Sequence, residues 1–124
     1  MKNDLNSVLI EGNLVSDPEL AYKPNGTPVA KLRIASKRCY KTEDEYGQEI
    51  SLFEIIVYDR KGEVCQEKLR KGRGVRVVGR LKQERWQEAD GSDREKIIIV
   101  AEHVEFKPKR EEPINLDRAE ATPA

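Results

Sequence analysis

The sequence predicts an all-β domain, and three observations support that class. Short runs rich in β-branched and other apolar residues alternate with turn signals along most of the chain. Two dipeptides typical of hairpin turns, Asn25-Gly26 and Asp90-Gly91, lie between such runs. Residues 29–37 alternate between apolar and cationic side chains, which is the period of two expected for a strand with one buried face.

Three strands are expected in the first half of the chain. Residues 7–14 form the first, and residues 29–37 form the second, with the turn-rich segments 16–18 and 23–26 between them. A polar loop, residues 41–49, leads to the third strand at 51–58. This third strand carries large apolar groups on both faces, so we expect one of them to meet a ligand or another subunit.

One helix and two further strands are expected in the second half. Residues 62–70 have apolar side chains near helical spacing and end at a glycine stop signal, so they predict a helix. The fourth strand, residues 74–82, would point Val75, Val77 and Leu81 inward. Gly79 has the same inward parity and indicates a bend or a close backbone approach.

The fifth strand, residues 96–101, follows the Asp90-Gly91 turn and continues toward Phe106. Five strands with a helix between the third and the fourth is the order of an oligonucleotide-binding (OB) barrel, which holds single strands or sugars. We therefore expect one OB-fold domain at residues 1–108. Residues 109–124 contain almost no apolar side chains and predict a short disordered tail.

Charge and composition limit the possible partners. Lysine plus arginine and aspartate plus glutamate both number 23, so the formal net charge is zero. Four of the acids and only one base lie from Glu111 onward, which leaves the preceding part mildly basic. Binding to phosphates would then depend on a local basic face rather than on overall charge.

Several classes of protein are disfavoured. Cys39 and Cys65 are widely spaced and match no metal motif, and the lone histidine, His103, lies on an expected strand. Glycine loops that cradle phosphates are absent, and the carboxylates are scattered through polar segments. The chain begins without the apolar run of a secretory signal, and no stretch is long enough to cross a bilayer. We expect no catalytic residue, cofactor, metal or membrane contact, and a cytoplasmic, nucleoid-associated location.

Aromatic and cationic side chains favour a binding function. Tyr40, Phe53, Tyr58 and Trp86 each lie on or at the end of an expected strand, and cations are interleaved with them. Such a pattern suits a single-strand groove, because bases stack on rings and phosphates contact cations without sequence preference. Two rings have an alternative: Trp86, the only tryptophan, could pack on the domain's own surface, and Phe53 could pack in the core.

Two groups of motifs resemble the bacterial single-stranded DNA-binding protein family. The first comprises residues 8–14, Asp17-Pro18-Glu19 and Pro24-Asn25-Gly26. The second comprises residues 69–72, residues 77–81, Arg85-Trp86 and Asp90-Gly91. They occur in the family's order at close to its spacing, over about residues 5–107. The resemblance implies an OB fold that assembles as a homotetramer and wraps single-stranded DNA over its surface.

The resemblance also implies site residues. Trp86, Tyr40 and Tyr58 match positions where the family has stacking aromatics, and the remaining stacking position falls on either Leu52 or Phe53. Lys41, Lys71 and Arg85 match positions that are commonly cationic. Together with the residue pattern, this predicts the following nucleic-acid-binding set: Tyr40, Lys41, Phe53, Tyr58, Lys71, Arg76, Arg80, Lys82, Arg85 and Trp86.

Three functions are consistent with these features. The leading one is sequence-independent binding and protection of single-stranded DNA during replication, recombination and repair. The alternative is a primosomal or accessory OB-fold adaptor, expected to be a dimer, with secondary nucleic-acid binding; a third is an RNA-binding OB module. The acidic tail with a hydrophobic tip, by which the family recruits replication and repair proteins, has no match at residues 121–124. We therefore do not expect recruitment by that route.

Overall fold

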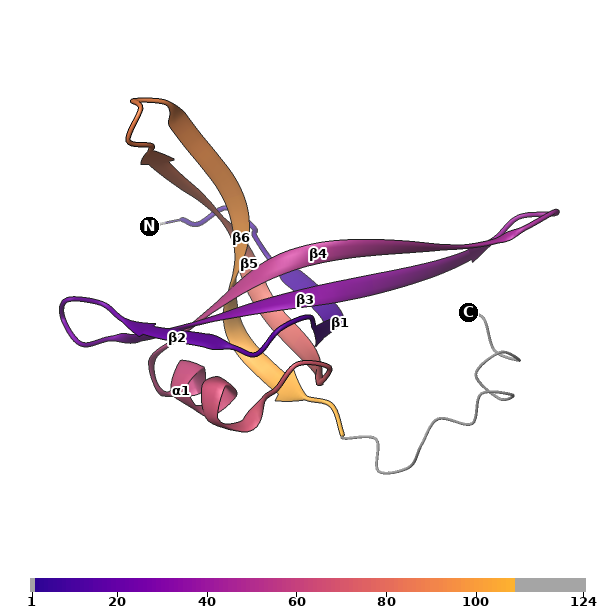
Figure 1. The fold of residues 1–124 in the computed structure, drawn as a ribbon, viewed down its shortest axis with the longest axis horizontal. Helices are drawn as coiled ribbons and strands as arrows, with labels where there is room; N and C mark the ends of the chain where they lie inside the picture. The colour runs from indigo at the N-terminus through magenta and orange to yellow at the C-terminus, as the bar shows by residue number, and fades with distance from the viewer. Residues whose placement is uncertain (1, 109–124) are drawn as a thin grey trace.

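The computed structural model describes residues 2–108, and the tail expected at 109–124 lies outside the described residues. The strands are longer than the sequence predicts (Figure 1). The elements are, in chain order, β1 (Val8–Leu14), β2 (Glu19–Tyr22), β3 (Pro28–Lys41), β4 (Tyr46–Tyr58), α1 (Asp59–Lys68), β5 (Gly74–Gln87) and β6 (Asp93–Phe106).

The strands close into a barrel of five strands with β2 added at one edge. The sheet order is β1-β5-β6-β4-β3-β2, and β1 also pairs with β3 through Asn13 and Leu14, which closes the ring. The β4–β6 pairing is parallel and the others are antiparallel. The predicted OB barrel is therefore confirmed, with its helix between the third and fourth barrel strands. Strand β2 was not predicted.

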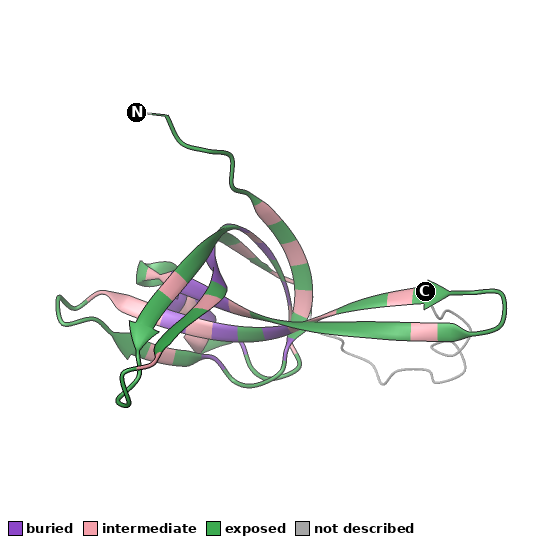
Figure 2. Ribbon diagram, turned by 90° about the horizontal axis from the view of Figure 1, so that it is seen from above, coloured by how far each residue is buried: buried purple, intermediate pink, exposed green. Residues whose placement is uncertain are grey.

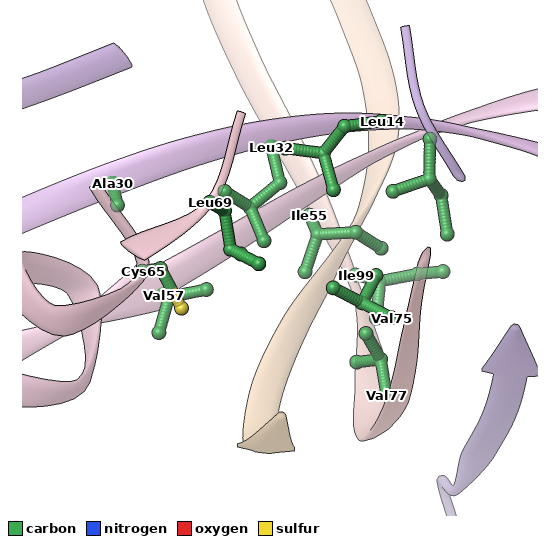
Figure 3. Close-up of a cluster of buried hydrophobic side chains, with 11 residues drawn as sticks. Leu14, Ala30, Leu32, Ile55, Val57, Cys65, Leu69, Val75, Val77 and Ile99 are labelled. Atoms are coloured by element: carbon green, nitrogen blue, oxygen red, sulfur yellow. The ribbon is translucent and has the colours of Figure 1, made fainter. Parts of the chain in front are cut away.

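Alternate residues of the barrel strands fill its interior. In Figure 3 the side chains of Leu32 (β3), Ile55 (β4), Val75 (β5) and Ile99 (β6) point toward one another, and each is at most 2% exposed. Helix α1 covers the same interior with Cys65, and Leu69 follows at the helix C-cap. Burial of these apolar groups is the main source of the barrel's stability.

Two long hairpins project from the barrel in different directions (Figure 1). Residues near their tips are mostly exposed, while the buried residues gather where the strands meet in the barrel (Figure 2). The polar loop expected at 41–49 is mostly strand, and its turn is confined to the tip, where Thr42 N–H donates to Glu45 O at 2.8 Å. Leu81 has the predicted inward parity, opposite Ile99, but it is 47% exposed, and the β1–β5 pairing ends before it at Gly79.

Gly79 is the point at which β5 bends out of the barrel. The β5–β6 register shifts between Val78 and Gly79. A Cβ atom at residue 79 would overlap the carbonyl oxygen of Val100 on β6. The close backbone approach predicted for this glycine is confirmed, and it is what allows β5 to continue into the second hairpin.

The junction of β4 and α1 fixes the position of Tyr58. Helix α1 begins at Asp59, three residues before the predicted start at 62, because its first turn is polar and shows no apolar period. Asp59 has a φ of 64°, in the left-handed region, which turns the chain sharply from strand to helix. Tyr58 is thereby held at the end of β4. Within residues 2–108, no helix has the length and apolar content needed to cross a membrane.

Candidate nucleic-acid interface

One side of the sheet faces away from the barrel interior and collects both rings and cations. Strand alternation and register define this outer face, because directly opposed residues on paired strands point to the same side. Its members include Val29, Lys31, Arg33, Leu52, Glu54, Ile56, Tyr58, Arg80, Lys82, Glu84, Trp86, Arg94, Lys96, Ile98 and Val100.

A small apolar cluster forms the middle of the outer face. Ile56, Ile98 and Val100 are buried there, although they lie outside the barrel, and Val29 and Tyr58 pack against them. The Nζ of Lys23 lies 4.6 Å from the centroid of the Tyr58 ring, a cation–π contact. Tyr58 is therefore supported from beneath by the cluster and has a cation at its ring.

Trp86 lies farther out on the same face. Its side chain remains 42% exposed, so the indole is not part of the core. The indole N–H donates to Glu88 Oε1 at 3.0 Å, which fixes the ring orientation. The Nζ of Lys96 lies 5.7 Å from the indole centroid. A half-exposed ring held in this way can present a π-face to a base.

Glu54 lies between these two aromatic sites and pairs with two lysines. Its carboxylate oxygens lie 3.1 Å from Lys31 Nζ and 2.9 Å from Lys96 Nζ, so the cluster joins β3, β4 and β6. Burial alone would raise the pKa of Glu54, but hydrogen bonds from Lys96 and Lys31 outweigh it and hold the pKa below its ordinary value. Glu54 is therefore an anion at neutral pH.

Two other cations of the outer face, Arg80 and Lys82, have no such partner among residues 2–108. They lie opposite Val100 and Ile98 in the β5–β6 register, beside the apolar cluster. Both can therefore meet phosphate oxygens without first breaking a salt bridge.

The tip of the β3–β4 hairpin carries a further aromatic site. Tyr40 pairs with Gly47 across the strands, and a Cβ at residue 47 would overlap the Tyr40 ring. The ring therefore lies directly over the glycine backbone. On the opposite side of this hairpin, Lys41 Nζ lies 5.3 Å from the Tyr46 ring centroid.

Three predicted site residues point away from the outer face. Tyr40, opposite Gly47, has the same parity as Phe53, whereas its neighbour Lys41 lies on the outer-face side of the hairpin. Phe53 pairs with Ile34 and has the parity of the barrel interior, whereas its neighbour Leu52 lies on the outer face with Tyr58. Arg85 is on the opposite side of β5 from Trp86 and lies 3.8 Å from Glu95. The aromatic or cationic character of Tyr40, Phe53 and Arg85 predicted them as ligands, but strand alternation separates them from Tyr58 and Trp86.

Two other predicted residues lie toward the far end of the barrel. Arg76 is paired with Glu11 at 3.1 Å and Glu105 at 3.7 Å, and hydrogen bonds from Lys107 and Arg76 hold the pKa of Glu11 below its ordinary value. Lys71 follows α1 and lines a cavity of about 490 Å³ whose other cations are Lys68, Arg70, Arg73 and Lys107. The cavity lies at the start of β5, and Trp86 lies near its end.

Cys65 belongs to the barrel core. Burial raises the pKa of the Cys65 thiol to about 11, so it is not a thiolate at neutral pH. His103 lies on β6, exposed. In the described part of the chain, no three histidine, cysteine, aspartate or glutamate side chains gather in a way that could hold a metal ion.

Three residues of the outer face were missed by the sequence-based prediction. Lys31, Glu54 and Lys96 occupy its centre, yet none was among the predicted ligands. Their strands were identified, and the outward parity of Lys31 was visible from the alternation of residues 29–37. The pairing of β4 with β6, which brings Lys96 to Glu54, links segments about 40 residues apart and leaves no local pattern.

Three curated relatives of this chain are all single-stranded DNA-binding proteins. A Helicobacter hepaticus single-stranded DNA-binding protein is 36% identical over 122 residues, which cover 94% of this chain and 72% of the relative. One from Treponema pallidum is 36% identical over 103 residues, covering 83% and 58%. One from Aquifex aeolicus is 39% identical over 108 residues, covering 85% and 73%. The chain thus spans 58–73% of the length of these curated relatives.

Solved structures agree on the fold. The Plasmodium falciparum SSB complex with ssDNA superposes with a TM-score of 0.78 at 22% identity, covering 87% of this chain and 99% of that one. A deletion mutant of the single-stranded DNA-binding protein from Thermus aquaticus gives 0.75 at 26% identity, covering 86% and 52%. The model of the single-strand binding protein family matches residues 5–107, and the chain therefore belongs to this family.

Proposed function

We propose that this chain binds single-stranded DNA without sequence preference and protects it during replication, recombination and repair, in the cytoplasm. The observation that carries the proposal is the outer face, where the rings of Tyr58 and Trp86 share one surface with Arg80 and Lys82, two cations that form no ion pair within residues 2–108. Rings stack on any base and cations contact any phosphate, so such a surface reads no sequence. Family membership and the named relatives give independent support.

In the proposed complex the strand runs over the outer face from Tyr58 to Trp86. Leu52 lies on this path and offers an apolar surface, whereas Phe53 faces the other side of β4. Lys41 extends this face at the β3–β4 tip, and Tyr40 offers a ring on the other side of the same hairpin. The cationic cavity around Lys71 offers a further contact for phosphate at the far end. Each stacked base would contribute about 1–3 kcal/mol.

We also propose that the chain self-associates, as a homotetramer. In the described residues, the segment of β1 from Val8 to Gly12 pairs with β5 alone, and β3 reaches only Asn13 and Leu14. Leu9 on this segment is 79% exposed. An open strand edge with an apolar side chain is a ready site for pairing with a second copy. Recruitment of replication and repair proteins would then act on the assembled form.

The test of DNA binding uses the intrinsic fluorescence of Trp86. Long poly-dT should quench it, and the affinity should fall as salt rises because phosphate contacts release counterions. Trp86→Ala, measured with a labelled oligonucleotide, should bind about tenfold more weakly or worse. Binding to duplex DNA that equals binding to poly-dT would contradict the proposal, and tighter binding to poly-rU would indicate an RNA-binding module.

Light scattering in the same buffer tests the assembly. A tetramer should give about four times the 14.2 kDa mass of one chain. A dimer that binds poly-dT weakly would instead favour the adaptor function. Leu9→Lys, which places a charge at the open edge of β1, should lower the assembled mass, because charged edge residues oppose strand pairing.

A further inference from the structure

The pairing of Glu54 with two lysines places a carboxylate in the middle of the surface that would receive phosphates. The Glu54 side chain is 16% exposed, while its partners Lys31 and Lys96 are 34% and 39% exposed. No carboxylate in the ion pairs of residues 2–108 is less exposed. This cluster is therefore more shielded from solvent and salt than the other ion pairs.

The carboxylate of Glu54 holds the ammonium groups of both Lys31 and Lys96. Lys96 donates a hydrogen bond to the carboxylate while its Nζ stays beside the Trp86 ring. Lys31 reaches the same carboxylate from β3. A carboxylate oxygen and a phosphate oxygen accept the same charge-assisted hydrogen bonds from an ammonium group. Toward these two lysines, Glu54 thus occupies the place that a phosphate of a bound strand would take.

We propose that Glu54 is an internal competitor for phosphate that holds Lys31 and Lys96 in the free protein and so weakens the binding of single strands. This inference rests on the proposed function and concerns how tightly the same surface binds. A base that stacks on Trp86 brings its phosphate close to Lys96, but the lysine must first leave Glu54. Once Lys96 has left, the strand also meets a carboxylate that is paired with Lys31 alone.

The first experiment replaces the carboxylate by its neutral isostere. Glu54→Gln should bind oligo-dT several-fold more tightly than the wild type at low salt. The dependence of log K on log salt should steepen by about 0.7 for each lysine that becomes free to meet a phosphate. Unchanged or weaker binding, or an unchanged salt dependence, would overturn the proposal.

The matched control is Glu49→Gln. Glu49 lies on the same strand as Glu54, opposite Arg38 in the β3–β4 register. Its side chain points to the opposite side of β4. Its replacement changes the net charge by the same amount. Glu49→Gln should leave affinity and salt dependence close to those of the wild type. An equal gain in both variants would show that overall charge, and not the lysine pair, sets the affinity.

A second experiment tests the lysine directly and does not depend on the folding of Glu54→Gln. In the wild type Lys31 is held by Glu54, so Lys31→Gln should change the affinity less than twofold. In the Glu54→Gln background the same change should remove part of the gain and reduce the salt slope by about 0.7. A large loss on replacing Lys31 in the wild type would overturn the proposal.

Failure of the proposed function and failure of the proposed role of Glu54 give different results. If the wild type does not bind oligo-dT at any salt concentration, the proposed function fails. If the wild type binds and Glu54→Gln binds no more tightly, the proposed function stands and only the role of Glu54 is lost.

Discussion

The ring of Tyr40 lies over the backbone of Gly47, its partner on the neighbouring strand. A side chain at residue 47 would occupy the space of the ring, so glycine is what lets the ring approach the backbone of the neighbouring strand. Tyr40 remains 51% exposed, so the ring is still accessible to a base. The pair therefore works as one unit in which the glycine sets the angle of the aromatic surface.

Replacing Gly47 by alanine should tilt the Tyr40 ring and weaken binding to oligo-dT. We expect a loss within the roughly 1–3 kcal/mol that one stacked base contributes. In a Tyr40→Ala background, Gly47→Ala should have no further effect, because the ring is already gone. Fluorescence anisotropy of labelled oligo-dT measures all four proteins. Equal losses in the two backgrounds would show that residue 47 acts without the ring.

The two sides of β5 should differ in their contribution to phosphate binding. Lys82 is an unpaired cation on the outer face, whereas Arg85 lies on the other side and is paired with Glu95. Lys82→Gln should weaken binding and reduce the salt slope by about 0.7, the value for one phosphate contact. Arg85→Gln should change both quantities less. The reverse order, from salt titrations of the two variants, would place the strand on the other side of β5.

A methyl group at Gly79 should be costly. Gly79→Ala would force the Cβ against the Val100 carbonyl, which belongs to the backbone and cannot swing away, so we expect a loss of about 3 kcal/mol in the free energy of unfolding. At Gly91, where φ is 88° and the surroundings are open, alanine should cost only about 1 kcal/mol. Urea unfolding measures both. Similar losses would mean that backbone conformation alone matters at residue 79.

The Glu54 cluster should make stability depend on pH in acid. Because the folded protein holds the pKa of Glu54 below its ordinary 4.5, the ionised carboxylate stabilises the fold above that pH. This contribution is lost as pH falls below 4.5 and through the folded-state pKa. Glu54→Gln should therefore lose less stability than the wild type over this range in urea unfolding. Glu49→Gln keeps the cluster and should follow the wild type; parallel curves for all three proteins would contradict this role.

The barrel could be predicted from the sequence because its strands have one buried face. The alternation of Ala30, Leu32 and Ile34 with cations gave β3, and the turn dipeptides gave Gly26 and Gly91, which have φ values of 90° and 88°. The outer halves of the hairpins could not be predicted in this way. No core selects their residues, so residues 41–49 look like a loop although paired backbones hold them as strands. Strand β2 is too short to show a pattern.

The site could be predicted by residue type but only partly by position. Tyr58 and Trp86 combine aromatic character with outward parity, and the structure places both on the outer face. Phe53 and Arg85 have the right chemistry on the opposite parity. Glu54 was included among scattered, solvated carboxylates, because its burial arises from strands that are distant in sequence. Register between strands, which the sequence does not display, decides which charges meet.

Each long strand of the two projecting hairpins has an inner end in the barrel and an outer end in the hairpin. The inner ends assemble the barrel, while the outer ends rest on little more than their own backbone ladders. Substitutions near the tips can thus change the affinity for a ligand with only small effects on the free energy of unfolding. In such a scaffold, mutations in the hairpins can change affinity during evolution while the packing of the core is preserved.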